Sequence, residues 1–266
     1  RLAARWTQLA QRLDLGHDQP LLVALSGGAD SVLLTHLVAA AAHSPDTLVV
    51  HVDHGLRGDE GRADARFCES LCRSLGLPFV LRHAHLDPTG PDLEARAREA
   101  RYRILLEEAR RDADAGTRAI LTGHHADDAL ETLMLRWLRG STLSGLSGLR
   151  ERLVVHGPSI DGHPVHEDLE PVTILRPLIA MRRQEVRRLL SDRGLAWRED
   201  STNLEGRFTR NRLRHRLLPL IEEHGGKDAL ANLEAFSEAV ESLEDRLAEA
   251  TAHLAWRRPS FSTASR

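Results

Sequence analysis

A short glycine loop between an apolar run and a helical pattern is the feature that most constrains this chain. The apolar residues 21–25 are followed at once by Ser26-Gly27-Gly28-Ala29-Asp30-Ser31, and residues 32–38 then repeat apolar side chains at helical spacing. A strand, a tight turn and a helix in this order direct several backbone N–H groups, at the positive end of the helix, toward one point. Gly27 and Gly28 have no Cβ, so an anion can approach the main chain closely. The stretch predicts a phosphate-binding loop.

This loop differs from a Walker P-loop, which carries Gly-Lys-Ser/Thr. No lysine is present in it, and Lys227 is the only lysine of the chain. Ser26 and Ser31 offer hydroxyl donors instead, and Asp30 offers a carboxylate that could hold Mg²⁺. The simpler alternative is a glycine-rich turn in which serine and aspartate only cap a helix. The loop alone does not decide between the two.

The rest of the chain alternates strand-like and helical patterns. Apolar, β-rich stretches at 47–52, 77–81, 118–122 and 172–175 are separated by helical patterns that include 59–75 and 92–113. This alternation predicts an α/β fold with a doubly wound, mostly parallel, five-stranded, Rossmann-like sheet.

Other stretches complete the predicted organisation. Residues 2–15 and 181–193 are expected to be helices, 139–148 a mobile loop, 151–171 a hairpin or irregular insertion, and a helix opening at Arg210 is expected to end near Pro219. A heptad-like helix over 228–256 has no sheet partner and forms a C-terminal helical extension. We therefore expect a nucleotide-binding catalytic domain over 1–217, and a helical linker that begins a tRNA-binding region over 218–266.

Polar residues follow two of the predicted strands. His51 and His54 lie at the end of the second strand, and Gly123-His124-His125-Ala126-Asp127-Asp128, with Glu131 one turn further, follows the fourth. Ligands of open parallel sheets bind beyond the carboxyl ends of strands, so both groups should lie beside the glycine loop. The acids could simply cap a helix and complement its dipole. The two histidines and three carboxylates could instead form a metal site or a pocket for a cationic substrate.

Composition narrows the classes of protein. With 266 residues, 41% of them hydrophobic, the chain suits a globular protein with a substantial core. No apolar run approaches the roughly 18 residues of a membrane span, so no membrane partner is expected. Cys68 and Cys72 are too few for a disulfide framework or a metal site, which favours buried residues and a cytoplasmic protein.

The net charge of −3 argues against a general nucleic-acid binder, but the positive charge is clustered. Arginines gather at 96–111, 182–188 and 207–216. The third cluster has few acids nearby, so it is the one expected to contact RNA.

Together these motifs resemble a known family. Ser-Gly-Gly-x-Asp-Ser resembles the signature of the PP-loop, or N-type ATP pyrophosphatase, family, which has the adenine nucleotide alpha hydrolase-like fold. With His51-Val52-Asp53-His54-Gly55-Leu56-Arg57, the stretch 122–132 and Arg210-Asn211-Arg212-Leu213-Arg214, residues 18–219 are similar to the tRNA(Ile)-lysidine synthase branch of that family. Asp53 stands where the branch often has asparagine. Many of its members carry further C-terminal tRNA-binding domains.

The resemblance implies an ATP-dependent ligase that forms a carbon–nitrogen bond. ATP would adenylate carbon 2 of the wobble cytidine in tRNA(Ile) with a CAU anticodon. The ε-amine of free L-lysine would then displace AMP and leave lysidine. The partners implied are ATP, Mg²⁺, L-lysine and this tRNA, and a homodimer is allowed.

The resemblance also assigns roles to residues. ATP or pyrophosphate would be held by Ser26, Gly27, Gly28, Ala29, Asp30, Ser31, His51, His54 and Gly123. Asp30 would hold the metal; Asp30, Arg101, Asp128 and Glu131 would be catalytic. Lysine would meet Asp127, Asp128 and Glu131, and tRNA would meet Arg210, Arg212 and Arg214.

Three alternatives stay open at this point. A PP-loop enzyme that thiolates tRNA would need sulfur-handling cysteines, usually Cys-x-x-Cys, and Cys68 and Cys72 have a different spacing. A non-catalytic adenine-nucleotide-binding module would have no need of the acid cluster. A metal phosphohydrolase built on His124 and Asp128 would leave the glycine loop unexplained.

Overall fold

The computed structural model describes residues 2–16, 18–41, 46–111, 117–157, 169–199, 212–226, 228–251 and 253. The chain forms two compact units, here called unit 1 and unit 2. Unit 1 consists of Arg1–Ala129 and Arg150–Asn211, and unit 2 of Leu130–Leu149 and Arg212–Arg266. This division follows packing, and the functional boundary expected between 217 and 218 stays a prediction.

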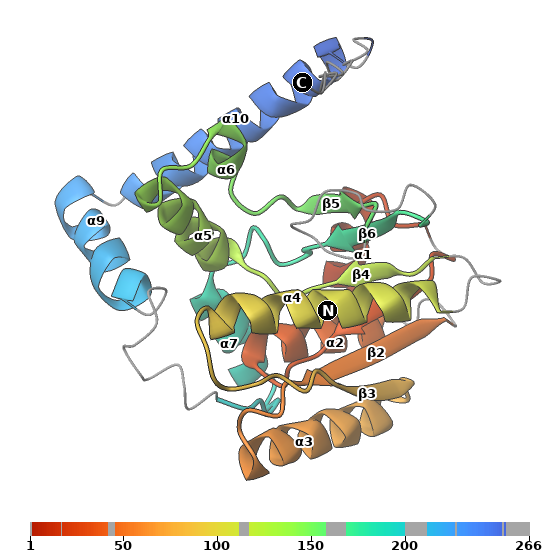
Figure 1. The fold of residues 1–266 in the computed structure, drawn as a ribbon. Helices are drawn as coiled ribbons and strands as arrows, with labels where there is room; N and C mark the ends of the chain where they lie inside the picture. Colours follow the sequence, from red (N-terminus) through yellow and green to blue (C-terminus); the bar gives the residue numbers. More distant parts are fainter. Residues whose placement is uncertain are drawn as a thin grey trace, which may run out of the picture. The chain divides into compact units, whose positions relative to one another are not determined.

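Unit 1 is built on a six-stranded sheet with the order β3-β2-β1-β4-β6-β5 (Figure 1). Five strands are parallel: β1 (Leu21–Ala24), β2 (Thr47–Asp53), β3 (Phe79–His83), β4 (Ala119–Leu121) and β6 (Val172–Leu175). In the centre, Val23 of β1 pairs with Val49 on one side and Leu121 on the other. The predicted α/β, mostly parallel sheet is confirmed.

The sheet has one strand more than the five expected. β5 (Arg152–Val155) pairs antiparallel with β6 in a stretch predicted to be a hairpin or irregular. Only Val155 of β5 is buried, so the strand lacks the apolar run that marks the buried parallel strands. That weak pattern explains why the sequence did not predict it as a sheet strand.

Helices cover both faces of this sheet, because successive side chains of a strand point to opposite sides. Val23 joins a core formed with α1 (Leu2–Arg12), α2 (Ala29–Ala40), α3 (Asp59–Leu75) and α7 (Arg183–Ser191). Leu22 joins a second core formed with α4 (Leu93–Arg110) on the other face. The carboxyl ends of β1, β2 and β4 therefore open between two layers of helices.

Unit 2 is helical. It contains α5 (Ala126–Leu138) from Leu130 onward, α6 (Leu143–Leu146), the π-helix η3 (Leu213–Leu217), α9 (Leu218–Gly225) and α10 (Ala229–Thr251). Its core consists of buried leucines and one methionine: Leu130, Met134, Leu135, Leu213, Leu218 and Leu230.

Two stretches of unit 2 differ from expectation. Residues 139–148, expected as a mobile loop, contain α6, and Arg136 donates to the Gly148 carbonyl over 2.8 Å. Pro219 does not end a helix, since helical backbone continues to Gly225. Proline has no N–H to donate, and it is tolerated here because it stands in the first turn of α9, directly after the π-helical turn η3.

Within the described ranges, no helix is both long enough and apolar enough to cross a bilayer.

Candidate functional site

The glycine loop is closed by its own hydroxyl groups. The Ser26 N–H donates to Ser31 Oγ over 3.1 Å, and the Ser31 hydroxyl donates to the Gly28 carbonyl over 3.0 Å. Gly27 has φ +91°, a conformation that favours glycine. Gly28 is the N-cap of α2, so the amides of Ala29, Asp30 and Ser31 lie in its first turn, where no intrahelical acceptor is available. The expected strand–turn–helix unit is thus formed, and phosphate binding by it stays a prediction.

Gly123 lies against this loop from the end of β4. A Cβ at Gly123 would stand 2.8 Å from Ser31 N and 2.9 Å from the Asp30 carbonyl carbon. Only glycine permits that approach. Because β1 has β2 on one side and β4 on the other, the loop and Gly123 lie at the switch point of the sheet, where ligands of such folds bind.

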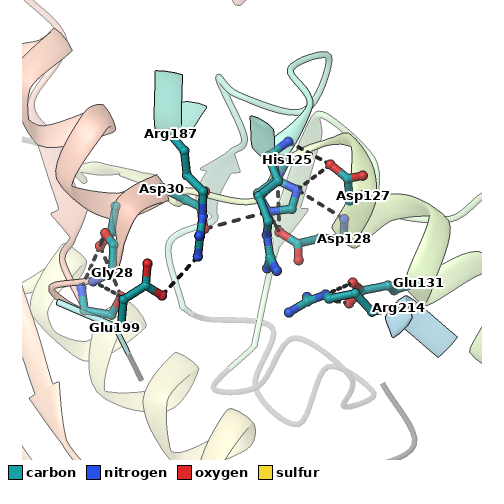
Figure 2. A network of polar contacts seen from close by, with 12 residues as sticks. Gly28, Asp30, His125, Asp127, Asp128, Glu131, Arg187, Glu199 and Arg214 are labelled. Carbon is teal, nitrogen blue, oxygen red and sulfur yellow. Dashed lines mark hydrogen bonds and ion pairs between the residues drawn. The ribbon is translucent and has the colours of Figure 1, made fainter. Parts of the chain in front are cut away.

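His125 is the centre of an acidic cluster beside the loop. Its ring is fully buried, with Nε2 3.7 Å from Asp30 Oδ2 and 3.6 Å from Asp128 Oδ2, and Nδ1 3.5 Å from Asp127 Oδ2. Figure 2 shows the ring between Asp30 and the two acids of α5. The sequence prediction gave the three acids roles in the reaction, but it considered His125 only as a member of a possible metal site.

Asp128 and His125 form a capping box at the start of α5. The Asp128 carboxylate accepts the His125 N–H over 3.1 Å, and the Asp128 N–H faces His125 Nδ1 at 3.4 Å. Asp127 serves a different helix, because its Oδ2 accepts the Arg183 N–H, at the start of α7, over 2.8 Å. Capping, one of the alternatives left open by the sequence, is therefore one use of both acids.

Asp30 has an unusual environment. Burial raises the pKa of its carboxyl, with Asp128 adding to the shift and His125, Arg183 and Arg187 opposing it. Its Oδ1 is buried and has no hydrogen-bond partner among the described residues. A carboxylate oxygen in that state suits a cation brought by a ligand.

A clamped pair of arginines flanks the loop, and the sequence did not predict it. The buried Asp64 holds Arg57 through its Oδ2 at 2.7 Å and Arg198 through its Oδ1 at 2.8 Å. The Arg198 N–H donates to the Gly27 carbonyl over 2.9 Å, which ties the segment after α7 to the loop. Fixed guanidinium groups at this place suit an anionic ligand. The clue available in the sequence was the position of Arg57 and Arg198 in the segments that follow a predicted strand and a predicted helix.

Two histidines at the end of β2 differ in their surroundings. His51 is buried, its Nδ1 lies 2.8 Å from the Leu25 carbonyl, and burial lowers its pKa. Because a carbonyl only accepts, Nδ1 carries the proton, so His51 supports the residue that precedes the loop. Burial also lowers the pKa of His54, and Arg101 adds to that shift.

Glu131 and Arg214 pair with each other in unit 2. Arg214 Nε and Nη2 donate to the two carboxylate oxygens of Glu131 over 2.5 and 2.9 Å (Figure 2). Glu131 is 2% exposed, and its ion pair with Arg214 lies within unit 2. The roles expected of Glu131 toward lysine and of Arg214 toward tRNA stay predictions. Arg212 is exposed, and Arg210 lies outside the described residues.

The cysteines are core residues, as predicted. Cys68 and Cys72 are fully buried, and burial raises the pKa of each thiol to about 12. Both therefore stay neutral and are unsuited to sulfur transfer. Among the residues described, no group of three or more His, Cys, Asp or Glu side chains is arranged to hold a metal ion, so the arrangement gives no support to a phosphohydrolase built on His124 and Asp128.

Curated relatives share the chain's sequence over most of its length. It is 38% identical over 253 residues to the tRNA(Ile)-lysidine synthase of Symbiobacterium thermophilum, covering 91% of this chain and 49% of the relative. It is also 38% identical to those of Solibacter usitatus (83% of this chain, 46% of the relative) and Thermus thermophilus (90% and 43%). The chain thus spans about half the length of these relatives.

Solved structures share the fold. The U34-tRNA thiolase NcsA of Methanococcus maripaludis, described with a [4Fe-4S] cluster, superposes with a TM-score of 0.65 at 16% identity, covering 90% of this chain and 78% of that one. The NMN synthetase of Francisella tularensis superposes with a TM-score of 0.51 at 12% identity, covering 97% and 99%. A family model described as the PP-loop domain matches residues 2–221, and with the glycine loop at the switch point of a parallel sheet this places the chain in the PP-loop family.

Proposed function

We propose that this chain supplies the catalytic part of a tRNA(Ile)-lysidine synthase, which uses ATP to join L-lysine to carbon 2 of the wobble cytidine of tRNA(Ile) with a CAU anticodon. The observation that carries the proposal is the meeting of the nucleotide-side carboxylate Asp30 with Asp127 and Asp128 around one buried histidine. The named relatives, each 38% identical, supply the substrate classes.

In the first proposed step the oxygen on carbon 2 of cytidine attacks the α-phosphorus of ATP, and pyrophosphate leaves. The first-turn amides of α2 would bind the leaving group, because they lie at the positive end of a helix. Arg57 and Arg198, fixed by Asp64, would add positive charge on the same side. The loop thus binds pyrophosphate as a leaving group and does not present a γ-phosphate for transfer.

In the second proposed step the ε-amine of lysine attacks carbon 2, and AMP leaves with the oxygen. Asp127 and Asp128 would attract the ammonium group, and one carboxylate would accept a proton so that the amine becomes a nucleophile. Both side chains remain about one quarter exposed, at 29% and 24%, so they can still meet a ligand while they cap helices.

The residues present also fit Mg²⁺. The buried Asp30 Oδ1, without a hydrogen-bond partner in the described part of the chain, would hold the ion together with phosphate oxygens of the nucleotide. When bound, Mg²⁺ neutralises charge that develops on the phosphates.

The test incubates the chain with ATP, radiolabelled lysine and a tRNA(Ile) transcript with a CAU anticodon. We expect ATP-dependent label in the tRNA, and none in a matched transcript whose wobble base is uridine. Asp128→Asn is the informative variant, because its amide oxygen still caps α5 while the charge is lost. It should bind ATP like the wild type and transfer lysine at least 10-fold more slowly.

Two results would contradict the proposal. One is the absence of lysine label from the tRNA. The other is incorporation of label from sulfide, which would support the thiolation alternative.

A further inference from the structure

His125 contacts the three carboxylates that the proposed function places against Mg²⁺ or lysine, although no substrate role falls to His125 itself. Nε2 faces Asp30 and Asp128, and Nδ1 faces Asp127, all between 3.5 and 3.7 Å. Asp30 comes from the start of α2, and the two other acids come from the first turn of α5. One fully buried ring therefore separates the nucleotide side of the site from its acidic side.

Each nitrogen of this ring also faces an N–H donor. The Asp128 N–H lies 3.4 Å from Nδ1, and Arg183 Nε lies 3.4 Å from Nε2. Nε2 thus lies near Asp30, Asp128 and Arg183, and Nδ1 lies near Asp127 and the first turn of α5. The ring therefore contacts both sides of the site.

The backbone around the ring is fixed on both sides. The Ala126 N–H, next to His125, donates to the Met181 carbonyl over 2.9 Å, and the Arg183 N–H donates to Asp127. Gly123, two residues before His125, lies against the Asp30–Ser31 backbone. The ring is therefore held between elements that cannot shift independently of it.

We propose that His125 is a positioning residue that sets the separation between Asp30 and the acidic pair Asp127 and Asp128, and thereby aligns the activated nucleotide with the attacking amine. This inference rests on the proposed function, whose second step needs the two reacting atoms roughly 3–3.5 Å apart. A misplacement of about 1 Å can slow such a step on the order of 100-fold without a comparable loss of binding.

Two variants test the two ring nitrogens of His125 separately. His125→Asn keeps a short polar group near Nδ1, and asparagine is among the best N-cap residues, so α5 stays capped while the contact toward Asp30 is lost. His125→Gln reaches further and places an amide near the position of Nε2. His36→Asn, a half-buried histidine of α2, serves as the matched control.

The experiment measures three quantities in the full chain: the dissociation constants of ATP and lysine by calorimetry, the free energy of unfolding in urea, and the single-turnover rate of lysine transfer. For His125→Asn we expect both dissociation constants within about threefold of the wild type and a transfer rate lower on the order of 100-fold. His125→Gln should recover at least 10-fold of that loss, and His36→Asn should match the wild type.

The outcomes separate the two proposals. A wild type that binds ATP and transfers no lysine overturns the proposed function, and the positioning role falls with it. A wild type that transfers lysine, with His125→Asn equally fast, overturns the positioning role alone. The positioning role is also overturned if His125→Asn and His125→Gln lose affinity for ATP and for lysine equally, and in parallel with stability. A purely structural role of His125 predicts that pattern.

Discussion

Replacing Gly123 by alanine would place one methyl group where the end of β4 meets the start of α2. The added Cβ would lie 2.8 Å from Ser31 N and 2.9 Å from the Asp30 carbonyl carbon, whereas ordinary contacts begin at 3.4 Å. The two segments must therefore separate by about 0.6 Å, the difference between 3.4 and 2.8 Å. Both neighbouring atoms belong to backbone, so neither can move away as the end of a side chain would. Overpacking of this kind costs about 1–3 kcal/mol of unfolding free energy.

The same displacement moves the glycine loop relative to the acidic cluster. We expect tRNA-dependent exchange of pyrophosphate into ATP to slow on the order of 10-fold to 100-fold in Gly123→Ala. Urea unfolding gives the stability, and exchange of labelled pyrophosphate gives the rate. Gly16→Ala is the matched control, because a Cβ there meets nothing within 4 Å. Exchange and stability in Gly123→Ala equal to those of Gly16→Ala would refute the argument from close approach.

Three further predictions concern stability and reactivity. Glu131→Leu should lower the free energy of unfolding in urea by about 3–5 kcal/mol, because it removes a buried carboxylate that accepts two hydrogen bonds from Arg214. Adding Arg214→Met should restore most of that loss, and equal losses in both variants would contradict this. Burial lowers the pKa of His51 from 6.5, so folding loses stability as the pH falls below 6.5, by at most about 1.4 kcal/mol per pH unit. His51→Gln should flatten that slope in urea titrations between pH 7 and 5, and an unchanged slope would exclude His51 as its source. Cys68 and Cys72, with pKa values raised to about 12, should resist a thiol-reactive dye at pH 8 in the native protein and react in urea; rapid native labelling would contradict their burial.

The parallel sheet could be predicted because its buried strands carry continuous apolar runs. The strand after the glycine loop's helix and the strand before the acidic motif each show such a run. β4 lies within the predicted range 118–122, and β2 ends one residue after the predicted range 47–52. β5 was not predicted because an edge strand with one buried side chain has no continuous apolar run. The predicted end of a helix near Pro219 was wrong, because proline interrupts the interior of a helix but is tolerated in its first turn.

The sequence predicted which types of residue form the site better than it predicted which residues contact each other. The glycine loop and Gly123 were identified from sequence because a close approach of two backbone segments, or of a ligand to the backbone, requires glycine at the point of contact. The pair formed by Glu131 and Arg214 joins residues 83 positions apart, and local spacing carries no information about such a contact. The clamp of Asp64 on Arg198 spans 134 positions and was missed for the same reason.

Unit 2 has a consequence for the order in which the chain can fold during synthesis. Its core joins Leu130, Met134 and Leu135 to leucines that follow residue 212. The apolar side of α5 is therefore translated about 80 residues before Leu213, its first partner in that core. Until then the emerging chain must keep three large apolar side chains away from other nascent chains. We expect this interval, more than the parallel sheet, to be when the chain depends on chaperones.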